Sequence, residues 1–403
     1  MKASDSAPGA SEELLDEIER RACLYFYEMA DPLTGLILDR AVPDQEYRPG
    51  ACSIAATGFG LSGLAIAHSR GYLDPSAVRE RVRRTLQFLC EDTEQEHGFF
   101  FHFLNSATGE RIWKSEVSSV DTGWLLCGAL HTKAYWKDDA QIVGLASELL
   151  NRADWPWMLN GSRTLSHGWT PEEGFLPYRW DSYSELLAMY LLAMASETHP
   201  IPADSWHSWK RPMKDYEGIF FIDAGAPLFV HQYSHAWFDF RDRQDRYANY
   251  FVNSQRATQA HRMYCMDLAS EYPWYGPDMW GVTASDSRRG YRIWGSPMLP
   301  PDGTLVPCAA GGSIVFLPQL CGAVLQTMME RYGKHIWCRY GFRDAFQPQL
   351  GWYGPDVIGI NLGIMLVMTE NLRTLSVWDA VMSTAEARRG MDAAGLRLQR
   401  IRS

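Results

Sequence analysis

The sequence predicts an all-α fold, an (α/α)6 barrel with short β pieces and long loops at the mouth of a cleft. Helical periodicity runs through most of the 403 residues. Alternate helical segments are apolar nearly all round, and the segments between them carry charge on one face. We expect this alternation when an inner ring of buried helices packs inside an outer ring of half-buried ones.

The individual elements follow from the same pattern. The predicted helices are 11–30, 52–72, 75–92, 115–136, 138–154, 184–196, 246–270, 317–333, 358–374 and 377–395. The inner ring is expected to contain the most apolar of them, 52–72, 115–136, 184–196 and 358–374. Short β-like pieces rich in aromatic residues lie at 35–40, 98–104, 174–180 and 218–224. The Trp-, Gly- and Pro-rich stretch 271–316 is predicted to be a loop, and loops of this length are commonly functional.

Composition limits the partners and the location. No linker or charge block divides the chain, so we expect one domain over residues 1–403, with 1–10 as a flexible tail. The net charge of −10 argues against a nucleic-acid partner. The apolar runs, such as LLAMYLLAMA, are too short to cross a bilayer, so no membrane partner is expected. The polar, acidic start is not a signal peptide, which predicts a cytoplasmic protein, or a periplasmic or secreted one if an export signal has been removed.

The aromatic and cysteine content narrows the chemistry. Many of the 16 Trp and 19 Tyr stand beside charged or polar residues, a pattern that suits the faces of sugars, although aromatic residues also fill cores. The eight cysteines form no CxxC pair and no zinc-spaced cluster, so we predict buried free thiols, no metal and no cofactor. His231 and His235 have helical spacing but no evident third zinc ligand.

Four polar clusters open or adjoin the apolar segments. In an α/α barrel the inner helices begin at one mouth, so polar residues at these starts converge there. The clusters are WKSEVSSVDT (Trp113, Glu116, Asp121), DSYSE (Tyr183, Glu185), HQYSHAWFDFR (His231, Gln232, His235, Trp237, Asp239, Arg241) and WGVTASDSRRGY (Thr283, Asp286).

Each cluster also has a structural explanation when it is taken alone. Glu185 and Glu116 are candidates for helix caps or first-turn acids that the helix dipole favours. The His/Asp/Arg group suits a buried network, and Asp286 suits a turn. Four aromatic-flanked groups in equivalent places nevertheless favour a common site. Motifs of dinucleotide, P-loop, α/β-hydrolase and zinc-protease sites are absent from the sequence.

Taken in order, several segments resemble the bacterial glucoamylase-like domain family, which includes the β-1,2-glucanases of glycoside hydrolase family 144 and a domain of cyclic β-1,2-glucan synthases. The segments are SIAATGFGLSGLAI, HGFFFHFLNSATGERIWKSEVSSVDT, YSELLAMYLLAMASETHPI, HQYSHAWFDFRD, YFVNSQRAT, WGVTASDSRRGY, DGTLVPCAAGGSI and RYGFRDAF. The similarity runs from about residue 20 to about residue 378. It implies an (α/α)6 barrel, an oligo- or polysaccharide partner and an inverting glycoside hydrolase. It gives no oligomeric state.

The resemblance also implies roles for single residues. The acid of the YxE motif, Glu185, is expected to be the general acid, and Asp121 of SSxDT a catalytic or substrate-contacting carboxylate, with Asp239 as another candidate for handling the water. Inversion places the two carboxyls roughly 6.5–9.5 Å apart. The expected substrate-binding residues are Trp113, Glu116, Tyr183, His231, Gln232, His235, Trp237, Arg241, Thr283, Asp286 and Asn361.

One segment departs from the resemblance. The family commonly has an IDQGP-like run near the C-terminus, whereas this chain has IGINLGI, with Asn361 and Leu362 in place of Asp and Gln. An amide cannot act as a general base, so the base is left to Asp121, Asp239 or Asp356. Two alternatives stay open: a related transferase or hydrolase of another linkage, and an inactive sugar-binding homologue. A terpenoid-type barrel is disfavoured because the sequence lacks Asp-rich metal motifs.

Overall fold

The fold is seen in a computed structural model that describes residues 9–225, 227–294 and 301–398. Most of the predicted tail lies outside these ranges, while Gly9 donates a hydrogen bond to Oε1 of Gln319 at 3.0 Å. The eight cysteines are free thiols, and all but Cys338 are buried, as expected. Among the described helices, none has the length and apolar character needed to span a membrane.

Helices make up the body and strands are short. The helices are α1 (Glu12–Glu28), α2 (Ile54–Arg70), α3 (Pro75–Glu91), α4 (Ser119–Tyr135), α5 (Ala140–Arg152), α6 (Trp155–Leu159), α7 (Leu187–Ala195), α8 (Tyr250–Asp267), α9 (Pro307–Gly311), α10 (Pro318–Ile336), α11 (Gly359–Thr374), α12 (Ser376–Met382) and α13 (Ala385–Ala394). The strands are β1 (Arg40–Ala41), β2 (Ala51–Ser53), β3 (Gln95–Glu96), β4 (Phe99–Phe100), β5 (Phe103–Asn105), β6 (Val117–Ser118), β7 (Gly168–Thr170), β8 (Gly174–Phe175), β9 (Met213–Tyr216), β10 (Ile219–Ile222), β11 (Arg243–Gln244), β12 (Trp337–Cys338), β13 (Gly341–Phe342), β14 (Phe346–Gln347), β15 (Trp352–Tyr353), β16 (Val357–Ile358) and β17 (Arg397–Leu398).

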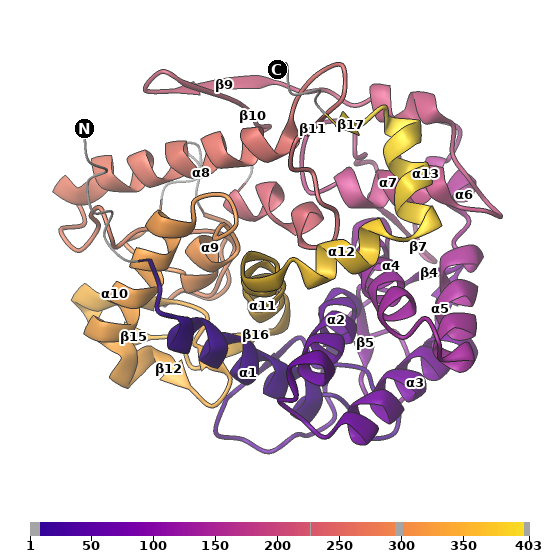
Figure 1. The fold of residues 1–403 in the computed structure, drawn as a ribbon, viewed down its shortest axis with the longest axis horizontal. Coiled ribbons are helices and arrows are strands. Elements are labelled where there is room, and N and C mark those ends of the chain that lie inside the picture. Colours follow the sequence, from indigo (N-terminus) through magenta and orange to yellow (C-terminus); the bar gives the residue numbers. More distant parts are fainter. Residues whose placement is uncertain (1–8, 226, 295–300, 399–403) are drawn as a thin grey trace.

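The helices form two concentric rings (Figure 1). The inner ring consists of α2, α4, α7, two 3₁₀ turns (Leu228–His231 and Tyr233–Ala236), α9 and α11. Around it, α1 packs on α2 and α11, α3 on α2, α5 on α4, α13 on α7, α8 on the first 3₁₀ turn and α10 on α9. This arrangement is the predicted (α/α)6 barrel, so the fold prediction is confirmed.

The hydrophobic pattern explains which helix belongs to which ring. Every residue of α7 is buried, as are residues 119–132 of α4, because apolar side chains surround these helices on all sides. The outer helix α3 instead buries one stripe, at Val78, Val82, Leu86 and Leu89. Burial therefore follows the sequence periodicity in both rings.

Two glycines allow α2 and α4 to pack closely. A Cβ atom added to Gly128 would lie 2.1 Å from the carbonyl oxygen of Gly58, and one added to Gly58 would lie 2.4 Å from the carbonyl oxygen of Trp124. Both distances are too short for any side chain, so this contact requires glycine on both helices.

Short strand pairs surround the end of the barrel where the inner helices begin. β2 leads into α2 and pairs with β5, β6 leads into α4 and pairs with β7, and β16 leads into α11 and pairs with β1, each antiparallel. This end, called the mouth below, therefore has its helix starts held in place by strand pairing.

Element boundaries differ from the predictions in several places. The helix predicted from residue 184 begins only at Leu187, and the one predicted from residue 115 begins at Ser119. The segment 377–395 forms two helices: the first ends at Met382, and Thr384 caps the second by accepting a hydrogen bond from Ala387 N. The short helices α6 and α9 were not predicted, and α9 lies within the stretch expected to be a loop.

Candidate active site

Glu185 lies in the turn before α7 and does not cap that helix. The hydroxyl of Ser234 serves the helix start instead: it accepts from Ala188 N at 3.0 Å and donates to the Glu185 carbonyl at 2.8 Å. The helix-cap explanation of Glu185 is therefore wrong. Its carboxylate instead accepts a hydrogen bond from the hydroxyl of Ser184.

The surroundings of Glu185 favour its protonated form. The residue is only 8% exposed, and this burial raises the pKa of its carboxyl. The Ser184 hydrogen bond lowers that pKa, and the charge of Asp121 raises it further. Among the described residues, no cation lies within ion-pair distance of Glu185. A carboxyl with a raised pKa keeps its proton to a higher pH, as a general acid requires.

Asp121 has the opposite surroundings. It lies in the first turn of α4, where the positive end of the helix dipole stabilises a carboxylate. Ser118 caps this helix: its hydroxyl accepts from Asp121 N at 3.3 Å and donates to Oδ2 of Asp121. His102 approaches Oδ1 with its Nε2 at 3.8 Å. The carboxylate of Asp121 thus has a hydroxyl donor on one oxygen and an imidazole nitrogen facing the other.

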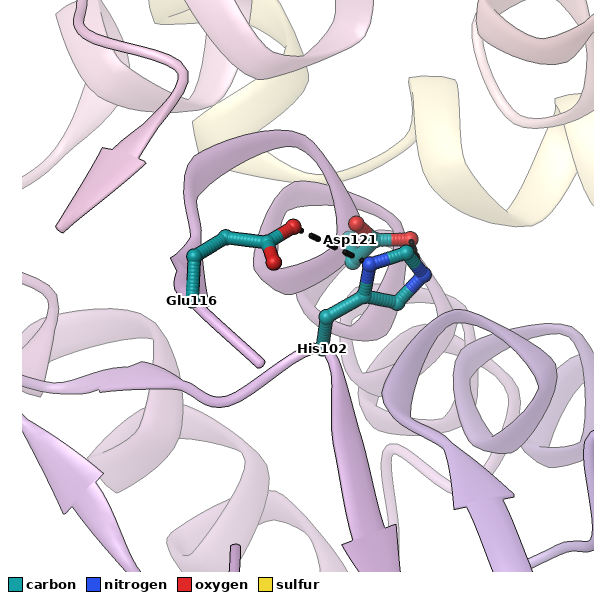
Figure 2. A group of neighbouring side chains, drawn as sticks. All are labelled: His102, Glu116 and Asp121. Carbon is teal, nitrogen blue, oxygen red and sulfur yellow. Dashed lines mark hydrogen bonds and ion pairs between the residues drawn. The ribbon is translucent and has the colours of Figure 1, made fainter. Parts of the chain in front are cut away.

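His102 lies between two carboxylates (Figure 2). Its Nδ1 lies 3.0 Å from Oε1 of Glu116, while its Nε2 faces Asp121. Burial opposes the charged ring, but Asp121, Glu116 and Asp39 together raise the pKa of His102 to about 9. Ligand-type atoms of His102, Glu116 and Asp121 lie within 4.8 Å of one another, yet the two ring nitrogens face different carboxylates. This arrangement is that of an imidazolium bridging two acids.

Asn361, at the start of α11, belongs to a second buried group. Its Nδ2 donates to Oδ1 of Asp344 at 2.6 Å, and its Oδ1 accepts from the hydroxyl of Tyr233 at 3.3 Å. The backbone N–H of Asp286 donates to Oδ2 of Asp344 at 2.7 Å. Burial raises the pKa of Asp344 to about 7, against these donors.

Arg40 forms ion pairs with three carboxylates near this group. Its guanidinium lies 2.9 Å from Asp286, 3.2 Å from Asp39 and 3.5 Å from Asp356. Burial raises the pKa of both Asp39 and Asp356. One cation thus serves three acids, and the mouth as a whole has an excess of carboxyl groups.

The two groups form one site. The charge of Asp39 acts on His102, which connects the Arg40 group to Asp121. Tyr233 connects Glu185 to the Asn361 group. Burial is the main cause that raises the pKa of Tyr233, and the charges of Glu185 and Asp344 raise it further. The carboxyls of both groups therefore surround the same mouth.

An aromatic series leads from the rim of the mouth to His102. The side chain of Trp113 is 72% exposed, and its backbone is in the left-handed region at φ 55°. Its ring contacts Phe103 at 5.3 Å between centroids, and Phe103 stacks on His102 at 4.0 Å. An exposed indole beside polar groups is suited to stacking on a sugar ring.

Three of the predicted substrate-binding residues are buried and contact other buried groups. Tyr183 is fully buried, and its hydroxyl lies 3.1 Å from Nδ1 of His231. His231 places its other ring nitrogen 3.6 Å from Asp223. Thr283 is buried and accepts a hydrogen bond from Phe229 N at 3.3 Å. These contacts support the segments that carry Glu185 and Asp286.

Asp239 and Arg241 lie away from the mouth, contrary to their predicted place in the cleft. They pair at 2.8 Å, and the guanidinium stacks over Trp378 of α12, which follows the far end of α11. On α11, Asn371 contacts this same segment by donating to the Ala236 carbonyl at 2.8 Å. At about 1.5 Å per residue, Asn371 lies roughly 15 Å along the helix from Asn361. Asp239 is therefore not placed to handle a water beside Glu185.

The remaining members of the 231–241 cluster hold the barrel together. Gln232 donates to the Ala309 carbonyl at 2.9 Å and to Ser313 at 2.7 Å. His235 lies 3.1 Å from Ser254, and burial lowers its pKa to about 3. The indole of Trp237, fully buried, donates to Ser62 in the middle of α2 at 2.9 Å. These three residues therefore form the buried structural network that the sequence analysis gave as the alternative to a sugar-binding role.

Sequence reasoning missed His102, Asp344 and Arg40. Two of them lie in segments that carried the resemblance: His102 in HGFFFHFL and Asp344 in RYGFRDAF. For His102 the available signal was an ionisable residue inside an otherwise apolar, aromatic run, because such a residue is costly to bury without a partner. Arg40 had no comparable signal.

Comparison with known protein families identifies the family of this chain. The model of the family described as "Putative glucoamylase" matches residues 177–385, more than half of the chain. The chain belongs to this glucoamylase family. This membership agrees with the resemblance seen in the sequence.

Several members of known structure or activity are similar along almost the whole chain. An exo β-1,2-glucooligosaccharide sophorohydrolase (non-reducing end) of Parabacteroides distasonis is 26% identical over 95% of this chain, which spans only 58% of that relative. The crystal structure of a putative glucoamylase of Bacteroides uniformis is 28% identical, with a TM-score of 0.90 and 99% of each chain covered. An endo-β-1,2-glucanase of Chitinophaga pinensis, in complex with sophorotriose and glucose, is 27% identical, with a TM-score of 0.88 and 98% and 99% covered.

In this member of the glucoamylase family, two carboxyls at the mouth have different surroundings. Glu185 is buried with no cation within ion-pair distance in the described part of the chain, and Asp121 is held by a helix start, a hydroxyl and an imidazolium. Pairs whose environments differ in this way are able to divide the roles of acid and base.

Proposed function

We propose that this chain is a glycoside hydrolase that cleaves β-1,2-linked glucan by inversion, with Glu185 as the general acid and Asp121 as the carboxylate that activates water. The contrast between the two carboxyls is the observation that carries the assignment: burial raises the pKa of Glu185, whereas the Ser118 hydroxyl donates to the carboxylate of Asp121 and the His102 ring faces it. The linkage is supported by the β-1,2-glucan activities of the Parabacteroides and Chitinophaga relatives.

The proposed reaction is a single displacement. Glu185 gives its proton to the glycosidic oxygen, while Asp121 takes a proton from a water that attacks the anomeric carbon from the opposite face. The bond to the leaving sugar breaks as the bond to the water oxygen forms, and the anomeric configuration inverts. Solvent then returns the proton to Glu185 and removes the one on Asp121. The exposed ring of Trp113 would bind a sugar at the rim.

A second candidate is binding of the glucan without cleavage. Asn361 favours it, because this amide stands where the family resemblance leads us to expect a carboxylate, and its side chain is occupied by Asp344 and Tyr233. A related transferase, or a hydrolase of another linkage, would use the same mouth with different sugar contacts. Product analysis on a panel of β-linked glucans separates these activities from β-1,2-glucan hydrolysis.

The decisive experiment measures sugar released from linear β-1,2-glucan by the wild-type chain and by Glu185→Gln. The amide keeps the shape but has no acidic proton to transfer, so we expect kcat/KM to fall about 10²- to 10⁴-fold. Glu197→Gln is the matched control, because Glu197 is 59% exposed and pairs with Arg389 on the surface. Full activity in Glu185→Gln would remove Glu185 from the role. Calorimetric binding of glucan with no turnover by the wild-type chain would support the second candidate.

A further inference from the structure

His102 takes no part in the proton transfers proposed above, yet it contacts one of the two residues that carry them. Its imidazole bridges Glu116 and Asp121, with 3.0 Å to the first carboxylate and 3.8 Å to the second (Figure 2). The bridge joins the segment before β6 to the first turn of α4. His102 is therefore placed to influence both the charge and the orientation of Asp121.

The position of the ring is fixed on several sides. The backbone N–H of His102 donates to the Glu116 carbonyl at 2.8 Å, and its carbonyl accepts from Ile54 N, at the start of α2, at 3.2 Å. The imidazole stacks on Phe103, with 4.0 Å between centroids and 16° between the planes. A ring held by its own backbone, a strand neighbour and an aromatic face loses little further freedom when it pairs with a carboxylate.

The charges that face His102 are mainly negative. They are Glu116 before β6, Asp121 on α4 and Asp39 before β1, with Arg40 beyond Asp39 and already shared among other acids. Burial opposes protonation of the ring, but the three acids outweigh it and raise the pKa of His102 to about 9. The ring is thus an imidazolium at neutral pH, and it lowers the pKa of Glu116.

We propose that His102 is a positioning residue for the hydrolysis proposed above: its ring holds the carboxylate of Asp121 in place for the water, while Glu185, which has no cation within ion-pair distance among the described residues, serves as the acid. The inference rests on the proposed function. Without this cation, the carboxylate of Asp121, whose charge raises the pKa of Glu185, has only the Ser118 hydroxyl as a partner. The division between acid and base then becomes weaker.

Kinetics test the positioning role. In His102→Gln the amide retains one hydrogen bond but no charge, so we expect kcat to fall at least about tenfold with little change in KM. The pH profile should change as well, because the variant has no imidazolium beside the two carboxyls. His102→Lys restores a charge and should recover part of kcat and of the profile. The control is His68→Gln, since His68 lies near the other end of α2 and contacts Tyr135. A fall in kcat with an unchanged pH profile would mean a merely structural role and would overturn the proposal.

A direct titration tests the ion pair without any turnover. In histidine-labelled protein, the NMR signal that disappears in His102→Gln should titrate with a pKa of about 9. Asp121→Asn and Glu116→Gln should each lower that pKa, because each removes a negative partner. An ordinary midpoint near 6.5, or no response to Asp121→Asn, would refute the pairing. A wild-type chain that cleaves no glucan but titrates as expected would instead refute the proposed function and leave the pairing intact.

Discussion

Asn361 donates a hydrogen bond of 2.6 Å to Asp344, so the amide at the position of an expected family carboxylate is the partner of another buried acid. Asp344 also accepts from Asp286 N, and both of its oxygens are therefore occupied by N–H donors. With an amide at position 361, this pair holds one carboxylate and no two adjacent negative charges. This suggests that Asn361 is matched to its surroundings.

The pair can be tested by exchanging its members. Asn361→Asp should destabilise the chain above neutral pH because it places two carboxylates together, and Asp344→Asn should do so because an amide cannot accept both N–H donors. In the double variant the new amide at position 344 can donate to the new carboxylate at position 361 and still accept from Asp286 N. We expect the cycle, measured by urea unfolding, to give a favourable coupling of about 0.5–3 kcal/mol. Additive losses would show that the two side chains are not coupled.

The pH range of activity should respond to Ser184. Its hydroxyl lowers the pKa of Glu185, which burial raises. As a general acid, Glu185 is active while protonated, so activity is lost as the pH rises through its pKa. Ser184→Ala should raise that pKa and move the alkaline limb of the kcat/KM profile to higher pH, whereas Ser208→Ala, at an exposed hydroxyl, should not. A shift to lower pH would contradict the assignment of Glu185 as the acid.

Trp113 should act on binding more than on chemistry. Its exposed ring lies at the rim of the mouth, next to Phe103, so its loss removes a stacking surface but no catalytic group. Trp113→Ala should raise KM for a glucan chain about 2- to 10-fold with kcat nearly unchanged. Trp113→Phe keeps an aromatic face and should remain close to wild type. A large loss of kcat in Trp113→Ala with an unaltered KM would argue against a role in binding.

The contact between α2 and α4 should tolerate no side chain at Gly128. A Cβ there overlaps the Gly58 carbonyl, so Gly128→Ala should lower the free energy of unfolding by about 1–3 kcal/mol or more in denaturant titrations. Gly144→Ala in α5 is the matched control, because nothing lies within 4 Å of its added Cβ. There the change should raise stability by about 0.5–1 kcal/mol. Equal effects at both positions would contradict the close packing seen between the inner helices.

The barrel could be predicted from sequence because burial and helical periodicity are local properties of each segment. The fully apolar run of α7 and the one-sided pattern of α3 were each sufficient to place a helix in its ring. Helix starts were less predictable. Leu187 begins α7 without a side-chain cap, and the hydroxyl that serves this start, Ser234, comes from a segment 46 residues away from Ala188.

The candidate site was predictable only in part for the same reason. Glu185, Asp121 and Asn361 stand at or just before the starts of inner helices, and such positions converge at the mouth. The residues 231–241 have similar composition, but they begin at the end of one 3₁₀ turn and contain a second, in which the His235 carbonyl accepts from the indole of Trp378. Nothing in their sequence distinguishes these turns from a helix start. His102 and Asp344 become recognisable only when their distant carboxylate and amide partners are known.

The most direct test of the central claim is a crystal structure of Glu185→Gln with a β-1,2-linked glucan oligosaccharide bound across the mouth. If Glu185 is the acid and Asp121 the base, the amide of residue 185 will lie at hydrogen-bond distance from a glycosidic oxygen. A water held by Asp121 will then face the anomeric carbon from the other side. A sugar bound out of reach of residue 185, or an attacking water held by a different carboxylate such as Asp344, would contradict that assignment.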